Sequence, residues 1–149
     1  METTVPTLPE FERFAREFAR GLRPRAGGAT LVTLSGELGA GKTAFTKAVA
    51  QELGIAEVVN SPTFVLEKIY ALPRESGTTG FARLAHIDAY RLEKGSELAP
   101  LGFDELMKDS GTLILLEWPE QVRDALPEPS VRIAITALDD GARRITFSP

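Results

Sequence analysis

The strongest chemical signal in this sequence is a run of eight residues that fits a phosphate-binding loop. The run consists of Gly36, Glu37, Leu38, Gly39, Ala40, Gly41, Lys42 and Thr43. It satisfies the pattern G-x-x-x-x-G-K-S/T at every fixed position. Glycines let consecutive backbone N–H groups turn inward around phosphates, in conformations that a side chain would hinder. The Lys42 ammonium can reach the β- and γ-phosphates of a nucleotide, and the Thr43 hydroxyl is a suitable Mg²⁺ ligand.

The residues on either side of this loop have the character that such a motif requires. Residues 31–34 form a short apolar, β-prone run directly before it, and residues 42–53 contain good helix formers that stop at Gly54. A phosphate-binding loop lies between a strand and a helix, whose free N–H groups and positive dipole end point at the anion. This context favours nucleotide binding over a chance match in a glycine-containing loop.

Two acidic residues at the ends of predicted strands are candidates for the carboxylate that a phosphate-binding loop needs. Glu117 ends the apolar run of residues 112–116, which we expect to be a central strand covered on both faces. Asp88 lies near the end of the preceding predicted strand. A carboxylate leaving the C-terminal edge of such strands points at the phosphate crevice, where it can complete the Mg²⁺ shell or orient the attacking water. The alternative for each is a solvated carboxylate at a strand end.

Three further features have more than one interpretation. His86 is the only histidine, which excludes a histidine-based metal site, and a structural hydrogen bond is its expected role. Residues 61–64 (Ser-Pro-Thr-Phe) follow the helix after the loop, where switch-like loops often approach the γ-phosphate. An ordinary turn into a strand explains that segment equally well. Trp118 could stack on a base or fill the core.

Composition restricts the classes of protein to which the chain can belong. With 149 residues, it has room for one domain with a hydrophobic core and little beyond. The absence of cysteine excludes disulfide frameworks, thiolate metal sites and cysteine nucleophiles. No apolar run approaches the roughly 20 residues of a membrane helix, and the N-terminus lacks the basic flank and apolar stretch of a secretory signal. These features together predict a cytoplasmic protein.

The charge balance argues against a nucleic-acid-binding face. The sequence has 21 acidic and 17 basic residues, which gives a formal net charge of −4. Proteins that hold nucleic acid through their own phosphate contacts are usually basic on at least one face. Several arginines gather near the start, in or just after a predicted amphipathic helix, and a solvated helix face is the better interpretation of them.

The pattern of apolar residues predicts a single α/β domain over residues 1–149. We expect a P-loop NTPase domain with a mixed parallel and antiparallel central sheet flanked by helices. Apolar residues spaced by three and four predict an amphipathic helix over residues 8–22. Strand-like runs at residues 63–70 and 81–90 are expected to pair antiparallel, and those at 131–137 and 143–147 to form a closing hairpin. Shorter helical segments are expected within residues 96–108 and 120–126.

The sequence is compatible with three classes of nucleotide-binding protein. A GTPase usually carries an N-K-x-D segment, which is absent here. An ATPase is the first expectation. A small-molecule kinase is the main alternative, because such kinases share the glycine spacing of the loop, and residues 90–95 could be a fragment of their arginine-bearing lid. A binding module gated by nucleotide without turnover is the third.

Four segments, in this order along the chain, resemble the TsaE family. They are residues 34–43 (LSGELGAGKT), 61–64 (SPTF), 86–92 (HIDAYRL) and 117–120 (EWPE). The resemblance implies an ATPase that serves bacterial synthesis of threonylcarbamoyladenosine, a tRNA modification beside the anticodon. It also implies a partner, the TsaB–TsaD heterodimer, whose repeated turnover the ATPase supports. Contact with tRNA would then be left largely to that complex, which agrees with the acidic charge.

The resemblance also implies roles for individual residues. Gly39 to Ala44 would hold the phosphates of ATP, Thr43 and Glu117 would ligate Mg²⁺, and Asp88 would support the metal or the water. Ser61 and Thr63 would belong to a switch-like loop, and Trp118 and Arg144 would lie near the nucleotide. Lys42, Glu117 and Asp88 are the expected catalytic residues. Ala44 stands where the family often has a second threonine, so a hydroxyl for the α-phosphate is missing while the backbone N–H remains.

Overall fold

The computed structural model describes residues 1–56, 66–73 and 80–149, which form seven strands and several helices. The strands are β1 (Glu2–Val5), β2 (Thr30–Ser35), β3 (Glu67–Ala71), β4 (Arg83–Asp88), β5 (Thr112–Glu117), β6 (Val131–Ala137) and β7 (Arg143–Ser148). The α-helices are α1 (Leu8–Gly21), α2 (Lys42–Glu52) and α3 (Phe103–Met107). Three 3-10 segments complete the described part: η1 (Gly95–Leu101), η2 (Pro119–Gln121) and η3 (Arg123–Ala125).

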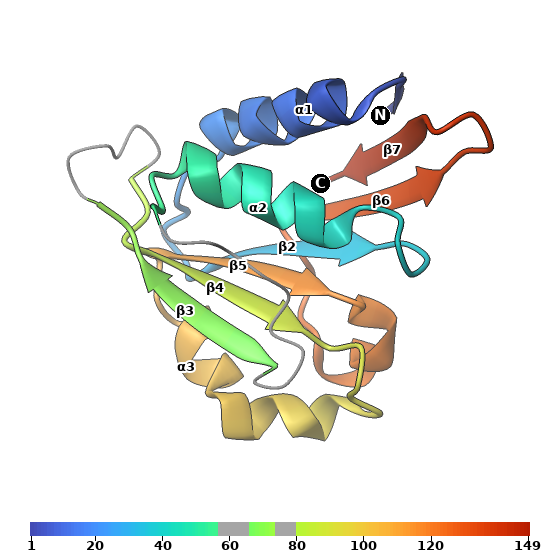
Figure 1. Ribbon diagram of the computed structural model, residues 1–149. Helices are drawn as coiled ribbons and strands as arrows, with labels where there is room; N and C mark the ends of the chain where they lie inside the picture. The colour runs from blue at the N-terminus through green and yellow to red at the C-terminus, as the bar shows by residue number, and fades with distance from the viewer. Residues whose placement is uncertain (57–65, 74–79) are drawn as a thin grey trace.

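All seven strands belong to one sheet, in the order β1-β7-β6-β2-β5-β4-β3. Neighbours among β6, β2, β5 and β4 pair parallel. The outer strands pair antiparallel: β3 with β4, β7 with β6, and β1 with β7. Helices α1 and α2 lie on one face of the sheet, and η1 and α3 lie on the other (Figure 1). This mixed sheet with helices on both faces confirms the fold class that the sequence predicted.

Strand β5 is an inner strand of the sheet, between β2 and β4, and is covered on both faces as the apolar run predicted. Each of its six residues is buried. Leu113 and Leu115 pack in the cluster beneath α1 and α2, whereas Ile114 and Leu116 pack in the cluster beneath η1 and α3. Because side chains alternate along a strand, one apolar run supplies both cores. Burial of each of these side chains contributes about 1.5–3 kcal/mol.

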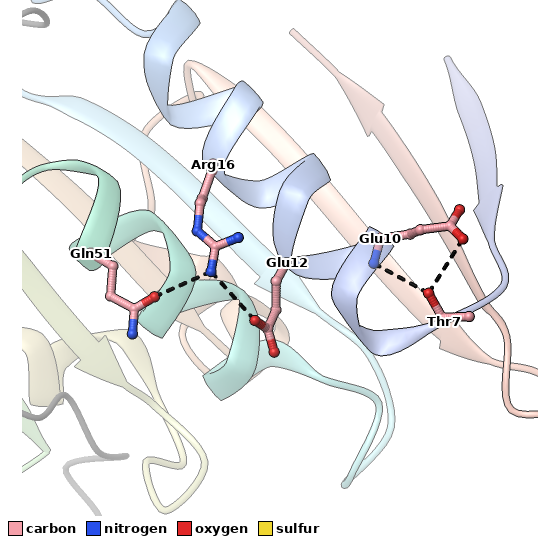
Figure 2. Close-up of polar contacts among 5 residues, drawn as sticks. All are labelled: Thr7, Glu10, Glu12, Arg16 and Gln51. Atoms are coloured by element: carbon pink, nitrogen blue, oxygen red, sulfur yellow. Dashed lines mark hydrogen bonds and ion pairs between the residues drawn. The ribbon is translucent and has the colours of Figure 1, made fainter.

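Helix α1 (Leu8–Gly21) agrees with the amphipathic helix predicted over residues 8–22. Phe11, Ala15 and Ala19, four residues apart, are fully buried on its inner face. Its first turn is capped by Thr7, whose hydroxyl oxygen accepts a hydrogen bond of 3.3 Å from the backbone N–H of Glu10 (Figure 2). Such a cap stabilises a helix by about 1 kcal/mol.

Helix α1 packs along α2 and so helps to fix the helix that follows the phosphate-binding loop. The guanidinium of Arg16 lies 3.4 Å from both the Glu12 carboxylate and the Gln51 side-chain oxygen, which joins the two helices (Figure 2). Beneath these polar contacts the Phe11 and Phe45 rings meet edge to face, with centroids 6.0 Å apart. The aromatic contact carries more of the packing energy, since half-exposed ion pairs contribute little.

The structure differs from the predicted elements at three places. Strand β1 was not predicted, and it forms by pairing with β7 at the edge of the sheet. The helix expected within residues 96–108 is divided into η1 and α3, because Pro100 lies inside η1 and Gly102 takes a left-handed conformation with φ of 76°. The helical segment expected within residues 120–126 consists of the two short 3-10 turns η2 and η3.

The predicted antiparallel pair and closing hairpin are confirmed. Tyr70 of β3 lies opposite Leu84 of β4, and Ile135 of β6 lies opposite Ile145 of β7. Residues 63–65 of the predicted strand lie outside the described part. Within residues 1–56, 66–73 and 80–149, no helix has the length and apolar character needed to cross a membrane.

Candidate nucleotide-binding site

Three parallel strands bring the candidate residues to one edge of the sheet. The phosphate-binding loop follows β2, Glu117 ends β5 and Asp88 ends β4. Glu117 lies opposite Leu34 of β2 on one side and opposite Asp88 of β4 on the other. Glu117 and Asp88 also share their side of the sheet with Leu34 and Leu115, which pack under α1 and α2. The predicted meeting of the loop with both carboxylates is therefore present in the described structure.

Two glycines of the loop are required by its close packing. Gly36 has a φ of 154°, and a Cβ atom there would lie 2.5 Å from the carbonyl oxygen of Ile135. Gly41 has a φ of 122°, and a Cβ atom there would lie 3.1 Å from both the Arg143 guanidinium and the Phe11 ring. Real Cβ atoms do not approach backbone oxygens as closely as 2.5 Å, so the glycines of the motif are explained by geometry as well as by phosphate chemistry.

Helix α2 begins at the loop with its first N–H groups uncapped by a side chain. Gly41 is the N-cap residue, and it has no side chain to accept hydrogen bonds from the first turn. The first N–H groups of a helix lack partners within it, and the helix dipole adds partial positive charge at this end. This arrangement is suited to an anion such as a phosphate group.

The loop and both carboxylates line one cavity of about 550 Å³. That volume is typical of sites for small molecules and cofactors. Its lining residues are Leu8, Leu38, Gly39, Gly41, Lys42, Thr43, Ala44, Asp88, Tyr90, Glu117, Trp118 and Arg143. Gly36, Glu37 and Ala40 instead line a second cavity, which shares Leu38 and Trp118 with the first. A smaller cavity of about 330 Å³ near Pro127 includes none of the loop residues.

Lys42 is almost fully buried, at 5% exposure, and is held by its own loop. Its ammonium donates hydrogen bonds of 2.5 Å and 3.0 Å to the carbonyl oxygens of Gly36 and Glu37. The same ammonium lies 4.2 Å from the centre of the Trp118 ring. Burial lowers the pKa of Lys42 from its ordinary value, and the nearby carboxylates, Glu117 foremost, partly oppose that change. An anion that enters the cavity would therefore stabilise the charged form of Lys42.

Glu117 is buried to 2% exposure and is hydrogen bonded to the only histidine. The distance from His86 Nε2 to Glu117 Oε2 is 2.5 Å, and His86 is fully buried. Because a carboxylate can only accept, the imidazole N–H is the donor. The structural hydrogen bond expected for His86 is thus present, and its acceptor is one of the predicted metal ligands.

Asp88 links the ends of β4 and β5. One of its carboxylate oxygens accepts a hydrogen bond of 3.0 Å from the backbone N–H of Tyr90. The next backbone N–H, that of Ala89, donates to the carbonyl oxygen of Glu117 at 3.0 Å. These contacts hold the two acidic residues in a fixed relation at the edge of the cavity.

Trp118 closes one wall of the cavity beside Lys42. Its backbone has a left-handed φ of 62°, which is uncommon for a residue other than glycine, and its N–H donates to the carbonyl oxygen of Leu34 at 3.1 Å. Its ring is partly buried and its centre lies 5.0 Å from that of Tyr90. The ring therefore packs against the core and also faces Lys42 in the cavity.

The structure brings Arg143 rather than Arg144 to the loop. Arg143 Nε donates a hydrogen bond of 3.0 Å to the Ala40 carbonyl oxygen, and its guanidinium lies 5.1 Å from the Phe11 ring. Arg144, which the resemblance placed near the nucleotide, is absent from the cavity lining, and its guanidinium lies 3.9 Å from Glu2. Alternation along β7 explains the difference, since Arg143 shares its side of the strand with the buried Ile145.

The remaining predicted site residues divide into two groups. Ala44 lines the cavity next to Thr43, as expected. Ser61 and Thr63 lie outside the described residues. Arg143 was not singled out from the sequence, although the alternation of polar and apolar residues in the last strand carried the signal. Leu8 and Tyr90 also line the cavity and were not predicted as site residues, although Tyr90 belongs to the segment 86–92 quoted above.

The oxygen atoms around the cavity are of the kind that Mg²⁺ prefers. The Thr43 hydroxyl and the carboxylates of Glu117 and Asp88 all line it. Within the described ranges, no group of three or more His, Cys, Asp or Glu side chains could hold a metal ion. Such a cluster is unnecessary here, because Mg²⁺ in nucleotide sites takes only one or two carboxylates, with phosphates and waters as its other ligands. The residues therefore fit a metal bound together with a nucleotide.

Comparison with known proteins points to one family. The model of the family described as "Threonylcarbamoyl adenosine biosynthesis protein TsaE" matches residues 5–145. A Bacillus subtilis protein named tRNA threonylcarbamoyladenosine biosynthesis protein TsaE is 42% identical over 79% of this chain and 68% of its own length. A protein of the same name from Rickettsia prowazekii is 34% identical over 94% of this chain and 89% of its own length. The crystal structure of Bacillus subtilis YdiB matches with a TM-score of 0.77 and 31% identity, covering 99% of this chain and 83% of that one.

Proposed function

The chain belongs to the TsaE family, and from this membership we propose that it is a Mg²⁺-dependent ATPase that supports threonylcarbamoyladenosine synthesis in tRNA. ATP binds at the phosphate-binding loop and is hydrolysed slowly. The observation that carries the proposal is the single cavity lined by Lys42, Thr43 and Glu117, with Asp88 beside them. A cation, a hydroxyl and two carboxylates at the start of a helix are the groups that phosphoryl transfer to water requires.

Each of these groups has a task in the proposed reaction. The first N–H groups of α2 bind the phosphates, and Lys42 exchanges its two loop carbonyls for phosphate oxygens. Thr43 and Glu117 would hold Mg²⁺, which neutralises charge on the phosphates when bound. Asp88, held by the backbone N–H of Tyr90 at 3.0 Å, supports the metal or orients the attacking water.

The proposed partner is the TsaB–TsaD heterodimer, which would contact tRNA while this chain contributes the ATPase. A net charge of −4 supports an indirect relation to tRNA. The ATPase cycle then serves repeated turnover of the complex, and the threonylcarbamoyl group is transferred by the partner. A cytoplasmic location follows from that pathway.

The test is ATP hydrolysis by the purified chain, measured alone and with added TsaB–TsaD complex and tRNA. We expect slow release of phosphate by the chain alone and strong stimulation by the complex. A Lys42→Ala chain serves as the control for contaminating ATPases. Absence of stimulation in the presence of normal ATP binding would contradict the proposal. A phosphorylated product that appears only with a small-molecule acceptor would favour a kinase, and binding without any turnover would favour a nucleotide-gated module.

A further inference from the structure

We propose that His86 is a positioning residue that holds the Glu117 carboxylate in the orientation needed for the metal. The imidazole N–H is hydrogen bonded to Glu117 Oε2, and Oε1 is left to bind Mg²⁺. This inference rests on the proposed Mg²⁺–ATP chemistry and adds to it a residue with no direct contact to nucleotide, since His86 is fully buried and is absent from the cavity lining.

The register of the sheet explains how a residue of β4 reaches a carboxylate of β5. His86 lies opposite Leu115, two residues before Glu117, and all three side chains share the face under α1 and α2. The imidazole extends along the strands to Glu117 Oε2, at 2.5 Å. Its contact therefore comes from two residues before the strand ends at the edge of the sheet.

The two oxygens of Glu117 have different surroundings. Oε2 is bound by His86. Oε1 has no hydrogen bond from any described residue, and the Glu117 side chain lines the cavity with Thr43. A carboxylate at a cavity wall with one oxygen fixed and the other without a hydrogen bond from the described residues is suited to a metal ligand role, since partners of ligating carboxylates fix their orientation.

The imidazole itself depends on Glu117 for its orientation. Among the described residues, His86 Nδ1 has no hydrogen-bond partner. Glu117 is thus the one described group that selects the tautomer, and it selects the form with the proton on Nε2 because an ionised carboxylate only accepts.

The first test uses the fact that His86 is the only histidine. Nitrogen-15 NMR of the full chain then reports its two ring nitrogens without ambiguity. We expect the Nε2–H tautomer in the free protein. We also expect the ring signals to shift when Mg²⁺ is added to protein saturated with a non-hydrolysable ATP analogue, and to return on adding EDTA. An Nδ1–H tautomer, or ring signals that ignore Mg²⁺ while the affinity responds to it, would overturn the inference.

The second test measures how much Mg²⁺ increases the affinity for the same analogue. His86→Leu removes the hydrogen bond and is expected to reduce the gain from Mg²⁺ by about 10- to 100-fold, the usual effect of losing a partner of a metal ligand. Its affinity in EDTA should stay within about twofold of the native value. His86→Gln, whose amide can donate to Glu117, should restore most of the gain. The matched control is Leu84→Met, a buried change on the same face of β4.

The outcomes separate this inference from the proposed function. If the native chain binds the analogue equally with and without Mg²⁺, the proposed metal chemistry fails. If the native chain responds to Mg²⁺ but His86→Leu responds equally, the positioning role fails while the proposed function stands. An equal loss of affinity in EDTA, or a His86→Gln chain as impaired as His86→Leu, would assign His86 to folding alone and would also overturn the inference.

Discussion

At the scale of single residues, Lys42 is held by contacts that a phosphate would replace. Its ammonium is bound by two carbonyl oxygens of the loop and faces the Trp118 ring. These contacts keep a nearly buried cation hydrogen bonded in the free protein, so they limit the cost of its burial. In the proposed function, ATP would exchange these neutral acceptors for charged ones, and hydrogen bonds between two charged groups are the stronger kind.

Replacement of this lysine tests the exchange directly. Lys42→Ala should weaken ATP binding at least about 100-fold, since two charge-assisted hydrogen bonds of about 1.5–3 kcal/mol each are lost. Isothermal titration calorimetry measures the affinity. The control is Lys47→Ala, because Lys47 is exposed on the same helix and lies outside the cavity. An equal loss in both variants would contradict the assigned role.

Removal of the Glu117 carboxylate should separate binding from hydrolysis. Glu117→Ala keeps the loop and Lys42, so we expect ATP affinity measured without Mg²⁺ to stay within about tenfold of native, whereas hydrolysis should fall by about 100-fold or more because the metal loses one protein carboxylate. Single-turnover hydrolysis of labelled ATP measures the step. Normal turnover in this variant would remove Glu117 from the mechanism.

At the scale of elements, α2 depends on α1 for its position, and Phe45 is the main contact between them. Phe45 is fully buried, and its ring lies 6.0 Å from Phe11 and 5.7 Å from Phe18. Phe45→Ala should lower the free energy of unfolding by about 3–5 kcal/mol. Urea denaturation measures the loss. Phe14→Ala removes a partly buried ring from the same layer and should cost clearly less; equal costs would argue against the central place of Phe45.

Strand β3 carries a glutamate whose burial affects stability. Partial burial raises the pKa of Glu67 above its ordinary value of 4.5. The folded chain therefore binds this proton more tightly than the unfolded chain, and the contribution of Glu67 to stability rises as pH falls through the raised pKa towards 4.5. At neutral pH the charged form is unfavourable in the folded state.

Replacement of Glu67 by glutamine removes the unfavourable burial of its charged carboxylate. Glu67→Gln should be more stable than the native chain at pH 7, by less than about 1 kcal/mol because the side chain is only partly buried. The difference should shrink as the pH is lowered towards 4.5. Thermal unfolding at several pH values, with the exposed Glu93→Gln as control, measures it. A difference that grows on acidification would contradict the sign.

The elements also show what the sequence could predict. Loop, helix and strand-end carboxylates were predictable because each depends on a local pattern: glycine spacing, an apolar run and the residue that ends it. The bond between His86 and Glu117 was not, because it depends on β4 and β5 being neighbours in register, which no local pattern encodes. Strand β1 was also missed, since its four residues have little apolar character and form a strand by pairing with β7.

At the scale of the whole molecule, the net negative charge predicts weak binding of tRNA by the chain alone. Basic side chains on the described surface are often paired, as in the contacts of Arg20 with Glu52, Arg83 with Asp109 and Arg132 with Glu128. The net charge of −4 leaves no general attraction for a polyanion. The charge of the chain therefore offers little general attraction to a nucleic acid.

Binding of tRNA by the chain alone should accordingly be weak. We expect no complex below about 10 µM protein at physiological salt, where even non-specific binders of nucleic acid show dissociation constants of about 10⁻⁴–10⁻⁶ M. A filter-binding or gel-shift assay measures this. Addition of the TsaB–TsaD complex should bring tRNA into the assembly. Tight binding by the chain alone would contradict an indirect role.

The pairing of β1 with β7 at one edge of the sheet affects when the phosphate-binding loop acquires its supports during synthesis. β1 pairs with β7, and β7 supplies Arg143, which contacts the phosphate-binding loop at Ala40. The central β2 in turn needs β5 and β6, which come later in the chain. During synthesis on the ribosome, the loop is thus exposed long before its supports exist. If the loop binds ATP as proposed, affinity for ATP should arise only when β7 has emerged and Arg143 can contact the loop.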